Sequence, residues 1–223
     1  MKQYKIVVIC MCILLLLAGG VYAQQKTVRI LAIGNSFSQD AVEQYLHELA
    51  EAEGISTIIG NMFIGGCSLE RHVKNDGKKR EKGKMSLEAV LADEDWDYVS
   101  LQQASPFSGM YETYEASLPE LIEYVKVRLP KKTKLMLHQT WAYASTSRHS
   151  GFKNYNCNQL TMYQAIADAV KKAAKANKIK IVIPSGRLSS GCEDWTLYRC
   201  LYLVRTHLQT QCSRESLCPG RVG

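Results

Sequence analysis

The sequence predicts an α/β fold: a mainly parallel five-stranded sheet covered by helices on both faces. Short apolar and β-branched runs, typical of buried strands, alternate along the chain with longer segments of helical periodicity. Strands that alternate with helices in this way form parallel sheets. The length of 223 residues fits one domain. A content of 46% hydrophobic and 22% charged residues excludes disordered, collagen-like and multi-span membrane proteins.

The first segment of the chain predicts export. Lys2 and Lys5 precede an apolar run, Ile6–Leu17, and small residues then lead to Ala23. This is the pattern of a secretory signal peptide over residues 1–23, and the run is shorter than the roughly 20 residues of a membrane-spanning helix. An uncleaved N-terminal anchor is the alternative. We expect a mature chain from Gln24, without a further membrane span, whose formal net charge falls from +7 to +5 because two lysines are lost.

The predicted elements alternate along the rest of the chain. Buried strands are predicted at Val28–Ile33, Ser56–Ile64, Trp96–Leu101, Lys134–His138 and Lys180–Ile183. Helices are predicted from 3.6-residue spacing at Asp40–Ala52 (with Ser38 as its N-cap), Ser117–Arg128 and Gln159–Ala176. In such sheets the functional site lies at the carboxyl ends of the strands.

A basic segment, Lys74–Lys84, interrupts this alternation with six basic and two acidic residues. It is predicted to be a solvated loop. A nucleic-acid partner is disfavoured, because no aromatic residues interleave with the charges and the chain carries an export signal. The positive net charge permits an anionic partner without requiring one.

Residues suited to serine-hydrolase chemistry follow three of the predicted strands. Ser36 lies in Gly34-Asn35-Ser36-Phe37-Ser38, where the first strand meets a helix N-terminus whose backbone N–H groups can stabilise an oxyanion. Gly65-Gly66 follows the second strand and offers a backbone N–H. Gln102-Gln103 follows the third strand and offers a side-chain amide. Three such donors beside a serine form an oxyanion hole.

Four segments in order resemble the SGNH (GDSL-like) hydrolases: Ile33–Ser38, Gly65–Leu69, Trp96–Ser105 and Gln139–Tyr143. The resemblance covers roughly Val28–Gly186 and is strongest to an exported, poorly characterised branch from gut Bacteroidetes. It implies a flavodoxin-like three-layer α/β/α sandwich and a bacterial, periplasmic or extracellular enzyme. It also implies hydrolysis of esters, often acetyl esters of carbohydrates, with no cofactor and no metal.

The resemblance also implies roles for individual residues. Ser36 matches the nucleophile, and its backbone N–H is the first oxyanion donor. Gly66, or alternatively Gly65, matches the second donor. Gln103, or alternatively Gln102, stands where most of the superfamily has an asparagine as the third donor. Possible substrate contacts are Asn35, Gln102, His72, Trp141 and Tyr143.

The catalytic base is missing from its expected place. The superfamily takes its base and orienting acid from an Asp-x-x-His block near the C-terminus, and here Glu193, Asp194 and His207 follow the fifth strand with a different spacing. Of the other histidines, His47 is expected to be structural or exposed. We place His72 and His149 in loops near the site, where they could touch substrate. His138 could point into the site or be satisfied in the core.

Composition changes abruptly after Gly186. Residues 187–223 contain no lysine, five arginines and four of the eight cysteines. The family typically continues Pro-Ser-Gly-Thr-Ala-Ile-Gln, and one added A before the codons CGG-CTA-TCC-AGC would turn the observed Arg-Leu-Ser-Ser into Thr-Ala-Ile-Gln. One hypothesis is therefore a frameshift after Gly186, and the other is a genuine tail linked by disulfides. The cysteine spacings do not suggest a zinc site, and Cys67 and Cys157 could pair or be ordinary thiols.

The leading functional prediction is a serine esterase that hydrolyses acyl, chiefly acetyl, esters of small molecules or glycans. Because the base is lost or out of frame, this chain is expected to be weakly active or inactive. The alternative is a non-catalytic glycan-binding module in which Trp141, Tyr143 and Phe107 stack on sugar rings. A nucleotide-binding protein is disfavoured because no glycine-rich phosphate loop is present.

Overall fold

The computed structural model describes residues 27–43, 46–74 and 85–185. The predicted signal peptide, most of the basic segment and the tail from residue 187 lie outside the described residues. Within these ranges, no helix has the length and apolar character needed to cross a membrane.

The described strands form a five-stranded, all-parallel sheet, as predicted. They are β1 (Val28–Gly34), β2 (Thr57–Phe63), β3 (Tyr98–Gln102), β4 (Lys134–Gln139) and β5 (Ile181–Pro184). Their order is β2-β1-β3-β4-β5. The register brings their carboxyl ends to one edge: Gly34 lies opposite Phe63, and Gln102 lies opposite His138. The residues that follow β1, β2 and β3 are therefore neighbours in space.

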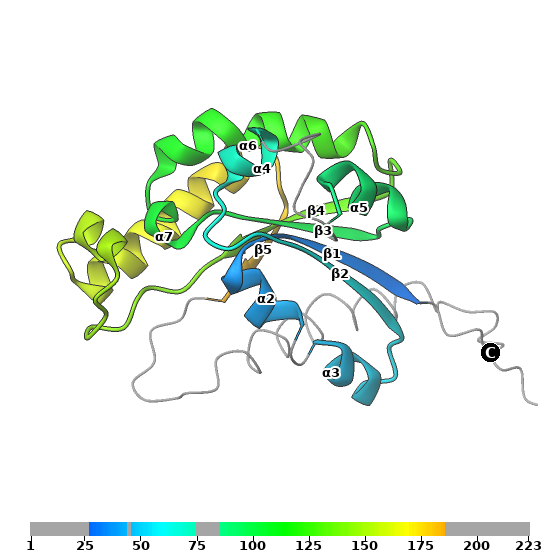
Figure 1. The fold of residues 1–223 in the computed structure, drawn as a ribbon, viewed down its shortest axis with the longest axis horizontal. Coiled ribbons are helices and arrows are strands. Elements are labelled where there is room, and N and C mark those ends of the chain that lie inside the picture. Colours follow the sequence, from blue (N-terminus) through cyan, green and yellow to red (C-terminus); the bar gives the residue numbers. More distant parts are fainter. Residues whose placement is uncertain (1–26, 44–45, 75–84, 186–223) are drawn as a thin grey trace, which may run out of the picture.

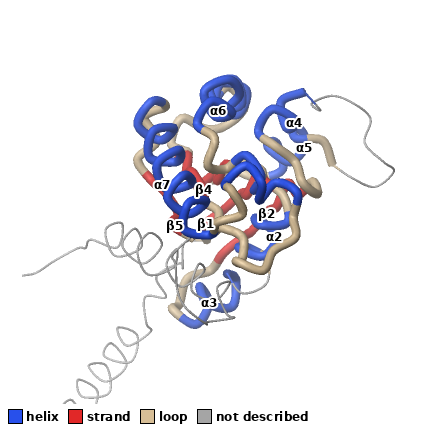
Figure 2. The backbone as a smooth tube through the Cα atoms, turned by 90° about the vertical axis from the view of Figure 1, so that its left-hand side faces the viewer, coloured by secondary structure: helices blue, strands red, loops and turns tan. Residues whose placement is uncertain are grey.

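Helices cover both faces of the sheet and complete the predicted three layers (Figure 1). One face carries α4 (Leu69–Lys74), α5 (Leu87–Asp93), α6 (Tyr111–Lys126) and α7 (Gln159–Ala176). The other carries α2 (Ser36–Val42) and α3 (Leu46–Ala52). Figure 2 shows the strands between these two helical layers. Two short 3₁₀ helices, η1 (Ser105–Phe107) and η2 (Ser150–Tyr155), follow the carboxyl ends of β3 and β4.

Burial on both faces explains why β1 is almost continuously apolar. Leu31 and Ile33 pack into the core under α4–α7, whereas Ile30 and Ala32 pack towards α2 and α3. This is the period-two alternation of a strand. Each fully buried Leu or Ile side chain stabilises the fold by about 1.5–3 kcal/mol. β1, an interior strand between β2 and β3, is thus a rigid base for the residues at its carboxyl end.

The first helical region differs from its prediction. One helix at Asp40–Ala52 is expected, but α2 already begins at Ser36 and a break separates it from α3. Asn35, not Ser38, is the N-cap, because its Oδ1 accepts a hydrogen bond from the Phe37 N–H at 3.2 Å. The Ser38 hydroxyl lies one turn further on and donates to the Asn35 carbonyl at 2.7 Å. The N-cap prediction at Ser38 was wrong.

The two long helices agree better with their patterns. The bounds of α7 are those predicted, and α6 begins at Tyr111, six residues before the predicted start. Pro119 lies inside α6 rather than in its first turn, so the helix continues on both sides of a residue that lacks a backbone donor.

Candidate functional site

Ser36 is presented at the carboxyl edge of the sheet by a sharp turn from β1 into α2. Asn35 is extended, with φ −139° and ψ −155°, and Ser36 is the first helical residue. The Ser36 side chain is exposed. Neither its hydroxyl nor its backbone N–H has a hydrogen-bond partner among the described residues. Both groups are therefore available to a ligand.

The Gly65-Gly66 turn after β2 lies beside Ser36. Gly66 has φ +59°, a left-handed conformation that favours glycine, and it is exposed. No residue of the described ranges accepts a hydrogen bond from its N–H. The Asn35 side chain ties the two turns together, because its Nδ2 donates to the Cys67 carbonyl at 2.9 Å. Two unpaired backbone donors, those of Ser36 and Gly66, thus lie at adjacent strand ends.

The buried side chain of Gln102 fixes the side chain of Asn35 by a hydrogen bond. Its Nε2 donates to Asn35 Oδ1 at 2.8 Å and to the Gln103 carbonyl at 3.0 Å. Asn35 is 2% exposed and Gln102 is 0% exposed. Both were predicted as possible substrate contacts, but in this structure they lie beneath the Ser36 turn and position it. A buried hydrogen-bonded network of this kind specifies one arrangement of the chain.

Gln103 does not present its amide beside Ser36 in this structure. The side chain is buried, and its Nε2 donates to the Thr113 hydroxyl at 3.1 Å. Its Oε1 accepts from the Leu69 N–H at 3.1 Å and from the Ala104 N–H at 2.9 Å. The predicted third oxyanion donor is therefore engaged in joining α4 and α6 to the end of β3.

The histidines differ in how deeply they lie and in what they contact. His72 lies in α4 rather than in a loop, and its buried ring bonds through Nε2 to the Gly34 carbonyl at 3.0 Å, so it supports the Ser36 turn from inside. His138 is buried and bonds to the Ser185 hydroxyl at 2.8 Å, which matches the core alternative.

His149 is exposed, and its Nδ1 accepts from the Gly151 N–H. His47 is exposed and pairs with Thr57. Among the described residues, no histidine is bonded to the Ser36 hydroxyl.

The predicted aromatic contacts separate into surface and core residues. Trp141 stacks on Phe37, the neighbour of Ser36, with ring centroids 3.8 Å apart. Phe107 is 40% exposed. Tyr143 is buried, its hydroxyl bonds to Ser105 at 2.7 Å, and burial raises its pKa above the ordinary value. Phe107 is therefore exposed and Trp141 is half-buried beside Phe37, whereas Tyr143 is mainly structural.

Sequence reasoning passed over Arg71. This exposed residue of α4 donates from Nη1 to the Gly66 carbonyl at 3.3 Å, so a guanidinium group lies against the turn that carries the second free N–H. Its position five residues after Gly66 is visible in the sequence. The missing signal was α4 itself, a short helix that the periodicity analysis did not predict.

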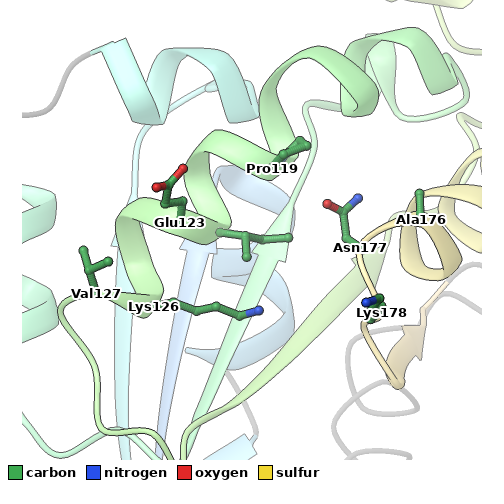
Figure 3. A pocket seen from close by; sticks show the side chains of 8 residues that line it. Pro119, Glu123, Lys126, Val127, Ala176, Asn177 and Lys178 are labelled. Atoms are coloured by element: carbon green, nitrogen blue, oxygen red, sulfur yellow. The ribbon is translucent and has the colours of Figure 1, made fainter.

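A hollow of about 350 Å³ lies elsewhere, between the C-terminal ends of α6 and α7 (Figure 3). Pro119, Lys126 and Lys178 are among the residues that line it. Since α6 leads to the start of β4 and α7 to the start of β5, the hollow lies at the edge of the sheet opposite Ser36. It contains no serine or histidine and is not the predicted site.

The described part of the chain contains no group of three or more His, Cys, Asp or Glu side chains that could hold a metal ion. Cys67, which is buried, and Cys157, which is exposed, are not joined by a disulfide. The disulfide considered for this pair is therefore not formed in the structure.

The family profile described as "Domain of unknown function (DUF4886)" matches residues 29–192. The chain belongs to the DUF4886 family. No curated protein matches it. The crystal structure of a DUF4886 family protein from Bacteroides uniformis is 49% identical, with 89% of each chain covered and a TM-score of 0.72.

Two more distant structures place the DUF4886 chain among the SGNH folds. A candidate SGNH hydrolase from Slackia heliotrinireducens has 20% identity and a TM-score of 0.56, over 81% of this chain and 99% of the other. A mutant of Axe2, an acetyl-xylooligosaccharide esterase from Geobacillus stearothermophilus, has 15% identity and a TM-score of 0.50, over 79% and 93%. At these identities the likeness concerns the fold, and at that level it confirms the SGNH resemblance and the three-layer sandwich.

Proposed function

We propose that this DUF4886 protein is a serine hydrolase of the SGNH type that cleaves acyl, chiefly acetyl, esters on glycans outside the cytoplasm. One observation carries the proposal: an exposed Ser36 hydroxyl lies beside two unpaired backbone N–H groups, those of Ser36 and Gly66, at adjacent strand ends. The SGNH fold and its occurrence in an acetyl-xylooligosaccharide esterase support the reaction class and the substrate class.

The geometry suits acyl transfer. Ser36 Oγ attacks the ester carbonyl carbon, its proton passes to a base, and the carbonyl oxygen becomes an oxyanion. The Ser36 and Gly66 N–H groups donate to that oxygen, and loss of a single such donor typically costs about 10²–10³-fold in kcat. Collapse of the intermediate breaks the acyl C–O bond, and the departing sugar alkoxide takes the proton back from the base and leaves as a hydroxyl. Water then attacks the acyl-Ser36 ester in the same way, releasing the carboxylic acid and restoring the serine.

The base is the part that the described residues do not supply. In the proposal, the base and its orienting acid come from an Asp-x-x-His block encoded after β5 in the other reading frame. The abrupt change in lysine, arginine and cysteine usage after Gly186 supports this frameshift. A chain that keeps only the nucleophile and the oxyanion donors retains residual catalysis.

The test is an assay of two full-length proteins, the chain as given and the chain with its frame restored after Gly186, on 4-nitrophenyl acetate and on acetylated xylooligosaccharides. We expect robust hydrolysis by the restored chain, and at least about 10³-fold less both by the chain as given and by restored Ser36→Ala. Equal activity of both chains would refute the missing base. Hydrolysis by restored Ser36→Ala at the rate of the restored chain would refute the nucleophile.

The same assay separates the alternative function. A glycan-binding module would bind acetylated xylooligosaccharides without hydrolysing them in either frame. Trp141, which lies against Phe37 beside Ser36, supplies an aromatic face for such binding. Binding without turnover in the restored chain would favour the module over the esterase.

A further inference from the structure

Arg71 carries a positive charge at the edge of the proposed active site. Its Nη1 donates to the carbonyl of Gly66, the residue whose N–H is the proposed second oxyanion donor. The same turn is joined to the nucleophile turn by the hydrogen bond from Asn35 to Cys67. The Arg71 guanidinium is therefore connected to the Ser36 turn through two hydrogen bonds, its own to Gly66 and that of Asn35 to Cys67.

The charge of Arg71 is not neutralised within the described structure. The other charged pair on α4, Glu70 and Lys74, is satisfied internally as an i,i+4 ion pair. His72 points inward to the Gly34 carbonyl. Arg71 forms no ion pair with any described carboxylate, and its Nε and Nη2 have no hydrogen-bond partner there. These two nitrogens form one edge of the guanidinium, which matches the two oxygens of a carboxylate.

We infer that Arg71 is an anion subsite beside the oxyanion turn, and that the substrate is an ester on a carboxylate-bearing glycan such as a uronic-acid oligosaccharide. This inference rests on the proposed function, because an acetyl group has no ionisable atom and the charge must therefore belong to the sugar part. The formal net charge of +5 expected for the mature chain adds a longer-range attraction for such a substrate.

The experiment measures binding, so that it does not depend on turnover. The probe is a partially acetylated oligogalacturonide, and its neutral control is the same oligosaccharide after methyl esterification of the carboxyl groups. Both are titrated calorimetrically into the full chain carrying Ser36→Ala. We expect the anionic form to bind at least about fivefold more tightly than the neutral form, since a hydrogen bond to a charged group contributes more than a neutral one. We also expect this preference to weaken with added salt.

Three variants assign the preference to Arg71. Arg71→Gln should abolish the preference for the anionic form. Arg71→Lys, which keeps the charge but cannot donate two parallel hydrogen bonds to a carboxylate, should keep part of this preference. The matched control is Arg128→Gln, an exposed arginine beyond the C-terminal end of α6 at the opposite edge of the sheet, which should leave the preference unchanged. Thermal unfolding of each variant verifies the fold.

Equal affinity for the two oligosaccharides, no binding of either, or a preference that survives Arg71→Gln would each overturn the inference. Hydrolysis is scored separately in the frame-restored chain with Ser36 intact. If selective binding is present but no ester is cleaved, the anion subsite stands and the proposed esterase activity fails.

Discussion

Gly34 shows how closely the nucleophile turn is packed. A methyl group at this position would lie 2.6 Å from Gln102 Oε1 and 2.9 Å from the Cβ and Oγ atoms of Ser38. Gln102 cannot easily withdraw, because its Nε2 is bonded to Asn35 and to the Gln103 carbonyl. The last residue of β1 is therefore a glycine for lack of space rather than for backbone freedom.

Replacing Gly34 tests this packing. We expect Gly34→Ala to lower the free energy of unfolding by about 1–3 kcal/mol, the usual cost of overpacking, and to lower the proposed esterase activity of the frame-restored chain by displacing Asn35. Urea denaturation measures the first effect. Gly65→Ala is the matched control for stability, because a methyl group at Gly65 would have nothing within 4 Å and the φ of this residue is not positive. If the two variants are equally stable, the turn is looser than its contacts indicate.

At the scale of elements, local signals were sufficient for α7 and insufficient for α2. The α7 bounds follow from an amphipathic pattern whose apolar positions, among them Met162, Ile166 and Val170, are buried. The start of α2 depends on Asn35, whose side chain is held by Gln102, a residue 67 positions away in the sequence. A local pattern cannot contain that contact. This is why the structure has Asn35 as the cap where Ser38 was predicted.

The N-cap of α7 gives a test at this scale. Asn158 Oδ1 accepts a hydrogen bond from the Thr161 N–H at 2.9 Å. We expect Asn158→Ala to reduce the free energy of unfolding by about 1 kcal/mol, and Asn158→Asp to leave it nearly unchanged because an aspartate oxygen can accept the same bond. Chemical denaturation of both variants measures the difference. Equal losses for alanine and aspartate would show that the cap contributes nothing.

For the whole molecule, the location of the site was more predictable than the hydrogen bonds between its side chains. Parallel strands bring their carboxyl ends to one edge, so Ser36, Gly66 and Gln103 were expected near one another before any contact was known. The directions of the side chains were not predictable in the same way. Gln103 turns to Thr113 and His72 to Gly34, because these contacts arise only when helices dock on the sheet.

That docking also buries a group of tyrosines, which predicts how the whole molecule responds to alkali. Tyr114 is 1% exposed and its hydroxyl donates to the Ser108 carbonyl at 3.0 Å; burial raises its pKa far above the ordinary value. Burial also raises the pKa values of Tyr143 and Tyr155. In the unfolded chain these phenols ionise near pH 10. Above that pH the unfolded state releases protons that the folded state retains. The contribution of these tyrosines to the free energy of unfolding is therefore constant below pH 10 and falls as the pH rises above it.

Tyr114→Phe isolates the largest contribution to this alkaline loss. At pH 8 we expect the variant to be less stable by about 1 kcal/mol, because one buried carbonyl loses its donor. Above pH 10, the free energy of unfolding of the unchanged chain should fall by up to about 1.4 kcal/mol per pH unit for each buried tyrosine. The variant has one buried tyrosine fewer, so its free energy of unfolding should fall less steeply by that amount. The two stability curves, measured by urea denaturation between pH 8 and 11, should therefore converge and then cross. Curves that remain parallel would mean that Tyr114 ionises equally well in the folded and unfolded chains, and that the interface between α6 and the sheet admits water.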